Sequence, residues 1–172
     1  MRVGPEGEVP PHHPNCFGCG PDNPAGLGLQ MRVDGEGIRA NLTLDARHEG
    51  APGLAHGGVV AAVFDDLFGG MLVVLEAPAV TANLNVDFRS PVPLGEPLVL
   101  RASNTGADGR KLMFGATLEA DGRLLAEATA VFVRVDLAHF KGTRAPIPEA
   151  WRRWGTAPRP PMHGSAQARD RA

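Results

Sequence analysis

The sequence has only two cysteines in 172 residues, and this scarcity excludes a secreted scaffold held together by disulfide bonds. It has no run of about 18 apolar residues free of charge, which a membrane-spanning helix requires. The longest apolar stretch, from Gly57 to Leu75, is interrupted by two aspartates. Residues 1–14 lack the apolar core of a signal peptide. We therefore expect a cytoplasmic protein with no membrane partner.

The net charge is also small. At −2, with 21% charged residues, it gives no electrostatic reason to expect nucleic acid as a partner. Composition divides the chain into three parts. Residues 1–26 are rich in proline and glycine and predict an extended or disordered lead-in, residues 27–136 have periodic hydrophobicity, and residues 137–172 form a basic tail with prolines. We expect one domain, over the middle part.

The periodic region predicts two strands, one helix and then four strands, which is an α+β arrangement. The helix is predicted over Gly57 to Glu76, which is apolar on nearly every side, as expected of a helix buried on most faces. A sheet wrapped around one helix covers only one side of it, so we expect a second copy of the chain to cover the other. Apolar and polar residues alternate, as in half-buried strands, over residues 27–33, 38–44, 80–88, 112–118 and 124–135, and a further strand begins at Leu98.

The predicted helix begins with His56, Gly57 and Gly58, a start that suits the binding of a negatively charged oxygen. The first N–H groups of a helix have no partner within the helix, and the helix dipole adds partial positive charge there. Glycine lets a ligand approach the backbone closely. Acyl transfer generates an oxyanion, which such amides stabilise. The alternative is that the two glycines only form a tight turn.

Two carboxylates, Asp65 and Asp66, lie in the middle of this apolar helix, where a carboxylate is costly unless it is paired. Helical spacing surrounds Asp65 with mostly small residues, which leave room for a substrate or a second helix, whereas Asp66 is less open. We interpret Asp65 as a functional acid; the alternative is that both pair with backbone groups across an interface. Asp65 follows Gly57 by about 12 Å along the helix, so Asp65 of one chain is expected to approach Gly57 of another.

The motif Cys-Phe-Gly-Cys-Gly at residues 16–20 has three interpretations. A redox pair of cysteines is typically followed by a helix, whereas glycines and prolines surround this one. A metal site could add His12 or His13, which gives only a partial ligand set for tetrahedral zinc. We favour the third interpretation, a tight glycine-rich loop with reduced thiols, and we predict no metal and no cofactor.

A longer pattern extends beyond the helix start. Residues 49–58 read Glu-Gly-Ala-Pro-Gly-Leu-Ala-His-Gly-Gly, Asp65 follows, and residues 81–85 read Thr-Ala-Asn-Leu-Asn. This pattern resembles that of the hotdog-fold thioesterases, in the phenylacetate-pathway (PaaI-like) branch and closest to the type of thioesterase superfamily member four, where Glu-Gly-x-Pro-Gly-x-x-His-Gly-Gly precedes a helix Asp and then Thr-Ala-Asn-Leu-Asn. The resemblance extends over residues 16–135.

The resemblance implies an antiparallel sheet wrapped around one central helix, and an acyl-CoA thioesterase that forms a free acid and CoA. It implies that the Gly57 amide polarises the thioester carbonyl and that Asp65 acts from a neighbouring subunit as general base or nucleophile. It implies that Thr81 orients the water or the Asp, and that His56 fixes the loop or participates directly. The expected assembly is a homodimer or tetramer whose sites are shared between subunits.

Thr81 fits the strand pattern poorly. Strict alternation places it with Asn83 and Asn85, opposite the apolar face that begins at Val80. Thr81 therefore needs a bend in the strand, or a position facing the partner, to reach the site.

Substrate binding is expected to involve Gly58 and three basic residues, Arg89, Arg110 and Lys111, because CoA phosphates favour arginine and lysine. The alternative for the basic residues is that they are solvated strand ends. The alternative function is a hotdog protein that binds or senses acyl-CoA without turnover.

Overall fold

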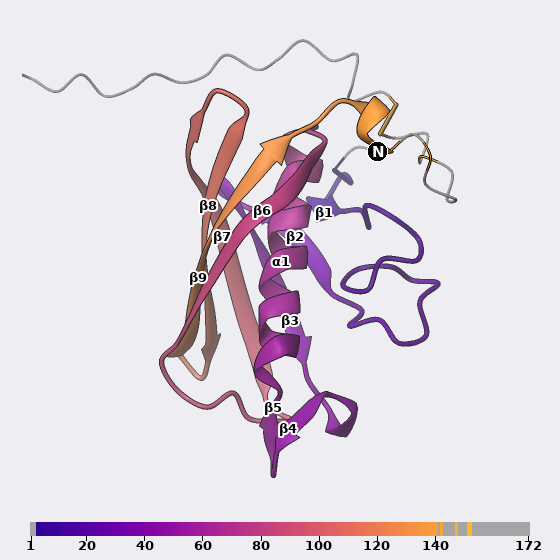
Figure 1. Ribbon diagram of the computed structural model, residues 1–172. Coiled ribbons are helices and arrows are strands. Elements are labelled where there is room, and N and C mark those ends of the chain that lie inside the picture. Colours follow the sequence, from indigo (N-terminus) through magenta and orange to yellow (C-terminus); the bar gives the residue numbers. More distant parts are fainter. Residues whose placement is uncertain (1–2, 141, 143–146, 148–150, 153–172) are drawn as a thin grey trace, which may run out of the picture.

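The structure is a computed structural model and describes residues 3–140, 142, 147, 151 and 152. One helix, α1 (Gly57–Val74), lies against an antiparallel sheet that curves around it (Figure 1). The sheet has the order β1-β2-β3-β7-β8-β9-β6. Its strands are β1 (Glu8–Val9), β2 (Gln30–Asp34), β3 (Gly37–Thr43), β6 (Ala79–Phe88), β7 (Pro97–Asp108), β8 (Lys111–Ala120) and β9 (Arg123–Arg134).

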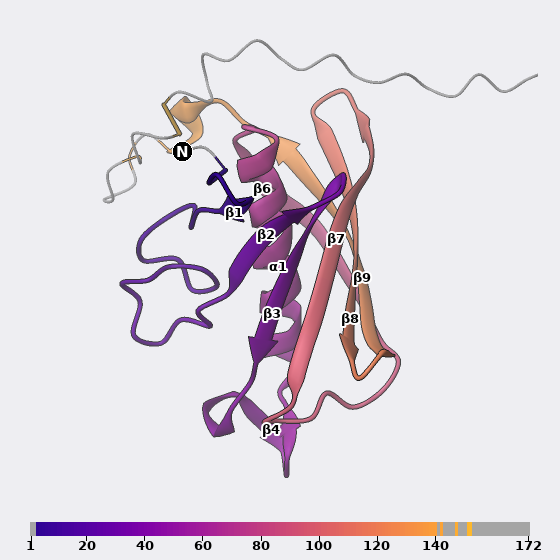
Figure 2. The ribbon, with the colours of Figure 1, turned by 180° about the vertical axis from the view of Figure 1, so that it is seen from behind.

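Short elements connect these parts. A 3-10 helix, η1 (Ala46–His48), leads into a two-stranded sheet of β4 (Glu49–Ala51) and β5 (Leu54–Ala55), just before α1. A second 3-10 helix, η2 (Leu137–Phe140), follows β9. Figure 2 shows from behind how the sheet curves from β2 past β3 and β7 to β8 and β9. The predicted α+β class and hotdog fold are confirmed.

The alternating sequence pattern explains the sheet. Along β8, buried and more exposed residues alternate from Lys111 to Ala120. The buried side chains face α1, where Phe68 packs against Phe114 and Phe132 with ring centroids 5.8 and 6.3 Å apart. Burial of each such ring contributes about 1.5–3 kcal/mol, so this aromatic cluster fixes the helix on the sheet.

Part of the segment expected as a lead-in, residues 1–26, joins the sheet and the hydrophobic core. Val9 of β1 pairs with Met31 of β2, and both Val9 and Cys19 are buried in the hydrophobic core. A strand of two residues has no detectable alternation, which is why the sequence pattern did not indicate it. Most of the tail over residues 137–172 lies outside the described residues; its Trp151 donates a hydrogen bond to the backbone oxygen of His12, at 3.1 Å.

By length and composition alone, α1 could cross a membrane. Core helices of soluble proteins pass the same test, and here the buried side chains of α1 pack against the sheet. The other side of α1 is more open and has small residues. Gly57 and Gly58 are exposed, while Ala62, Asp65 and Gly69 are half-buried.

Candidate active site

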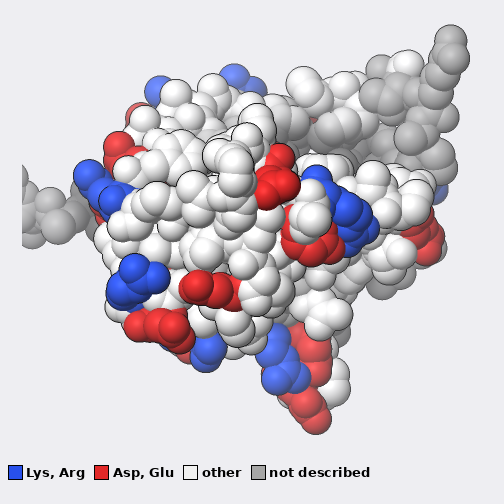
Figure 3. All heavy atoms as spheres, turned by 90° about the horizontal axis from the view of Figure 1, so that it is seen from below, with Lys and Arg blue, Asp and Glu red and all other residues white. Residues whose placement is uncertain are grey.

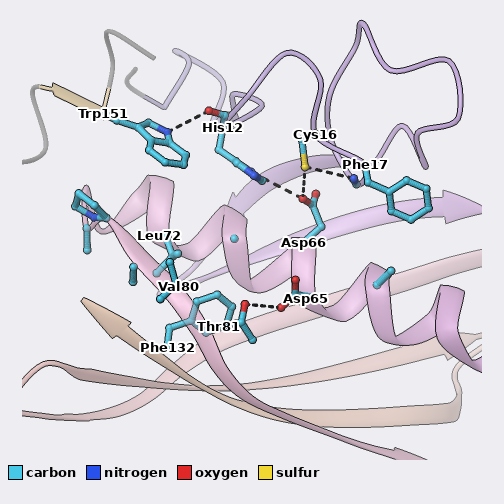
Figure 4. Close-up of a pocket in the computed structure, with 16 residues that line it drawn as sticks. His12, Cys16, Phe17, Asp65, Asp66, Leu72, Val80, Thr81, Phe132 and Trp151 are labelled. Atoms are coloured by element: carbon cyan, nitrogen blue, oxygen red, sulfur yellow. Dashed lines mark hydrogen bonds and ion pairs between the residues drawn. The ribbon is translucent and has the colours of Figure 1, made fainter. Parts of the chain in front are cut away.

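Asp65 and Thr81 meet on the open side of α1. The Thr81 hydroxyl donates a hydrogen bond of 2.8 Å to Oδ1 of Asp65. Both residues line a pocket of about 480 Å³ that lies between α1, the start of β6 and the N-terminal segment (Figure 4). The remaining walls are mostly apolar and include Leu72, Val80 and Phe132. A carboxylate is thus held in one orientation inside a largely apolar pocket.

A β-bulge turns Thr81 toward the helix. In the pairing of β6 with β9, Thr81 lies opposite Phe132 and Asn83 lies opposite Val131, so Ala82 is an extra residue without a partner. Since Phe132 is buried on the inner face of the sheet, Thr81 faces inward with it. The bend that Thr81 required to reach the site is present, as this bulge.

The start of α1 presents one amide to solvent. His56 is the N-cap residue, and its Nδ1 accepts a 3.0 Å hydrogen bond from the amide of Gly58. Among the described residues, no hydrogen bond uses the amide of Gly57. The cap therefore leaves the Gly57 amide for a ligand, whereas a ligand of the Gly58 amide would compete with His56.

The loop before α1 is held by its own side chains. Oε1 of Glu49 accepts a 2.7 Å hydrogen bond from the amide of Gly53, which has a φ of 75° that favours glycine. The backbone oxygen of buried His48 accepts from the amide of His56 at 2.8 Å. These contacts explain the Glu-Gly-x-Pro-Gly motif as a structure that fixes the direction of the helix start.

Within one chain the two halves of the predicted site lie apart. Gly57 and His56 line a separate groove of about 530 Å³ beside Phe88, and Asp65 does not line it. Asp65 follows Gly57 by eight residues of helix, which is about 12 Å. A single chain therefore does not bring the carboxylate to the Gly57 amide.

The predicted basic residues also lie apart. Arg89 lines the groove beside Gly57 and pairs with Glu127, with Nε 2.8 Å from the carboxylate. Arg110 and Lys111 lie at the turn between β7 and β8, at the opposite end of the sheet (Figure 1). Viewed from the end where α1 begins, basic and acidic side chains are interspersed, and neither sign gathers into a patch on that face (Figure 3). Of the three predicted basic residues, Arg89 alone lines the groove of Gly57 within one chain.

The structure has a second polar cluster, and the sequence did not predict that Asp66 belongs to it. The thiol of Cys16 donates to Oδ1 of Asp66 at 2.9 Å, and Sγ of Cys19 lies 3.2 Å from Nδ1 of His12. The two cysteines are not joined in a disulfide. His13, considered with His12 as a partner of the cysteines, instead accepts from the amide of Asn15. No local spacing signals the participation of Asp66, because it lies far along the chain from the cysteines.

Burial affects the acid–base properties of this cluster. It raises the pKa of Asp66. A hydrogen bond from Cys19 lowers the pKa of the Cys16 thiol, whose burial opposes the effect. Each of these four groups therefore affects how strongly its neighbours hold a proton.

Comparisons with known proteins place the chain in a family. The sequence profile of the Thioesterase superfamily matches residues 52–135. Acyl-coenzyme A thioesterase THEM4 of Rattus norvegicus is 36% identical over 90 residues, which are 51% of this chain and 39% of the relative. Human (Homo sapiens) acyl-coenzyme A thioesterase 13 is 32% identical over 95 residues, which are 52% of this chain and 67% of the relative. The match thus spans about two fifths of THEM4 and two thirds of thioesterase 13.

A solved structure, that of the thioesterase superfamily protein RHA08564, superposes with a TM-score of 0.66 at 28% identity. The superposition covers 69% of this chain and 60% of that protein. The sequence and structural matches agree on one family: the chain belongs to the thioesterase superfamily. The predicted resemblance to the THEM4 type is confirmed.

Proposed function

We propose that the chain hydrolyses an acyl-CoA thioester to a free acid and CoA. The observation that carries the proposal is the Thr81–Asp65 hydrogen bond, which holds a carboxylate in a mostly apolar pocket. The free amide of Gly57 supplies the second element, a donor for an oxyanion. The names of the relatives, which are acyl-coenzyme A thioesterases, support this class of substrate.

In the proposed reaction, Asp65 is the general base. It takes a proton from a water molecule, whose oxygen attacks the thioester carbonyl carbon. The carbonyl oxygen becomes an oxyanion and accepts a hydrogen bond from the Gly57 amide. When the tetrahedral intermediate collapses, the carbon–sulfur bond breaks, and CoA leaves as a thiolate that takes up the proton. Thr81 keeps the carboxylate oriented throughout.

We propose that two chains share each site, in a homodimer or in a tetramer built from such dimers. The groove of Gly57 and the pocket of Asp65 lie at different positions along α1, so antiparallel packing of two helices brings each acid near the partner's amide. The small residues of the open side of α1 permit close packing. At the sheet edge, β6 has no further neighbour among the described strands, and Phe88 on it is 54% exposed.

A thiol-release assay over a panel of acyl-CoAs tests the proposed activity. Hydrolysis of at least one acyl-CoA is expected, and Asp65→Asn is expected to lose at least about 100-fold, the scale of a general base. Asp108→Asn, at an exposed position in β7, is the matched control and keeps full activity.

Full activity of Asp65→Asn would show that another group is the base. The alternative of a sensor predicts a different result: saturable binding of acyl-CoA by calorimetry with no thiol release for any acyl group. That outcome would reject the proposed hydrolysis while leaving the substrate class in place.

A further inference from the structure

Four side chains from two distant segments converge between the N-terminal segment and α1. Nδ1 of His12, Sγ of Cys16, Sγ of Cys19 and a carboxylate oxygen of Asp66 all lie within 4.8 Å of one another. Figure 4 shows His12, Cys16 and Asp66 directed toward a common point above the helix. His12, Cys16 and Asp66 line the same pocket as Asp65 and Thr81, on the wall formed by the N-terminal segment.

The spacing of these atoms suits one tetrahedral ion. Ligand atoms bound to Zn²⁺ at about 2.0–2.3 Å lie about 3.3–3.8 Å from each other. Here the Cys19–His12 separation is 3.2 Å, the His12–Asp66 separation is 3.8 Å, and the Cys16–Asp66 separation is 2.9 Å. These three separations lie within about half an ångström of the tetrahedral range, and no separation in the set exceeds 4.8 Å.

The backbone around the cysteines is shaped for close contact with the acid. A Cβ atom on Gly18 would lie 2.0 Å from Cγ of Asp66, and one on Gly20 would lie 2.3 Å from the backbone nitrogen of Cys16. Only glycine allows this tight loop at both positions. The amide of Gly18 also donates to Sγ of Cys16 at 3.3 Å, a hydrogen bond that favours the charged thiolate.

The other oxygen of Asp66 points independently to a missing partner. Asp66 is 7% exposed, and its Oδ2 is buried without a hydrogen-bond partner among the described residues. A buried, unpaired carboxylate oxygen is costly, and a bound cation removes that cost.

We propose that His12, Cys16, Cys19 and Asp66 bind a structural Zn²⁺ ion. Thiolate and imidazole ligands together favour zinc over the hard cations, which prefer oxygen. Four protein ligands leave no open position, so the ion is structural and not catalytic. On binding, both thiols lose their protons to solvent, and four metal–ligand bonds form without any redox step. The ion fixes the N-terminal segment, which forms a wall of the pocket that contains Asp65.

Metal analysis of the untagged full-length protein tests the proposal. After dialysis, elemental analysis is expected to find about one zinc ion per chain. Replacement of zinc by Co²⁺ is expected to give the thiolate charge-transfer and strong visible bands of a tetrahedral site. A thiol reagent is expected to modify both cysteines rapidly only after a chelator has been added.

Variants locate the site and separate it from the proposed hydrolysis. Cys19→Ser and Asp66→Asn are expected to weaken zinc binding at least about 100-fold, because even outer-shell changes cost 10- to 100-fold. His13→Ala, which removes the neighbouring histidine, is the matched control and keeps the ion. Asp65→Asn keeps the ion as well, although it loses hydrolysis, so either proposal can fail alone.

Several results would overturn the zinc site. The first is that the protein contains no zinc after expression and takes up none when zinc is added. The second is a disulfide between Cys16 and Cys19 in the isolated protein. The third is that Cys19→Ser retains zinc. A metal other than zinc in the isolated protein would also contradict it. The wild-type measurements decide the question even if a variant does not fold.

Discussion

The amide of Gly57 can be removed without removing the helix that presents it. Proline is favoured at the first position of a helix, and His56 before it has φ −65° and ψ 131°, which a following proline accepts. Gly57→Pro is therefore expected to fold and to lose about 10²- to 10³-fold in kcat, the worth of one oxyanion donor. Thiol release gives the rate, and circular dichroism checks the fold.

Gly57→Ala is the matched control for the proline variant. It keeps the N–H group, and its Cβ would lie 3.4 Å from Cζ of Phe88, an ordinary contact. We expect it to stay active. Equal losses in the alanine and proline variants would mean that the space at Gly57 matters and that its amide does not.

Thr81 acts through Asp65, so its removal tests positioning. Thr81→Val keeps the shape and loses the hydroxyl, which is expected to lower kcat by about 10- to 100-fold with little change in KM, because a hydrogen bond to a charged group contributes about 1.5–3 kcal/mol. Thr81→Ser is expected to restore most of the rate. Thr129→Val, at an exposed position in β9, is the control. A rise in KM at constant kcat would contradict the positioning role.

At the scale of elements, replacing either of two adjacent glycines of α1 by alanine is expected to have opposite effects on stability. A Cβ on Gly70 would lie 2.3 Å from the sulfur of buried Met31, so Gly70→Ala is expected to lower the free energy of unfolding by about 1–3 kcal/mol. A Cβ on Gly69 would lie 3.4 Å from His12, and alanine gains about 0.5–1 kcal/mol of helix propensity there.

Thermal unfolding at one fixed protein concentration measures both glycine variants, since assembly makes the midpoint depend on concentration. The midpoint is expected to fall for Gly70→Ala and to stay or rise for Gly69→Ala. A reversed order would mean that the packing of α1 on β2 differs from that described.

The elements that the sequence predicted are those whose signal is local. Alternation located β2, β3, β6, β8 and β9, and the strand expected to begin at Leu98 is β7. The continuous apolar run located α1, which ends at Val74 instead of Glu76. The position of the bulge at Ala82 was not located, since the place of one extra residue depends on the pairing with the partner strand. The conflict between Thr81 and strict alternation was its only trace.

The residues of the candidate site also differ in whether a local sequence pattern predicted them. The small residues predicted around Asp65 include Ala62 and Gly69, and both line its pocket. For Asp66, by contrast, the sequence predicted only a carboxylate whose burial in the apolar helix costs free energy. Its contact with Cys16 spans 50 residues of sequence. Pairings at such separation depend on the whole topology, which spacing within one segment does not contain.

At the scale of the whole molecule, mixing two inactive variants tests the shared site. A mixed dimer of one Asp65→Asn chain and one Gly57→Pro chain contains one intact site. That site is formed by Asp65 of the Gly57→Pro chain and Gly57 of the Asp65→Asn chain. Random pairing of equal amounts is expected to restore about a quarter of the wild-type sites in a two-fold symmetric dimer.

Thiol release after co-expression, or after unfolding and refolding together, measures this recovery. The two variants kept in separate tubes and combined only in the assay serve as the control. No recovery in mixed dimers whose composition is verified by mass would place both groups in the same chain.

The position of β6 in the sheet determines when the site can form during synthesis of the chain. β6 precedes β7 in the chain, but its neighbour among the described strands is β9, so it cannot join this sheet until synthesis has passed Arg134. Non-local pairings of this kind are slow steps in folding. A chain that ends before β9 contains Asp65 and Thr81 but lacks the strand against which the bulge forms. The site is therefore among the last features of this domain to be completed as the protein leaves the ribosome.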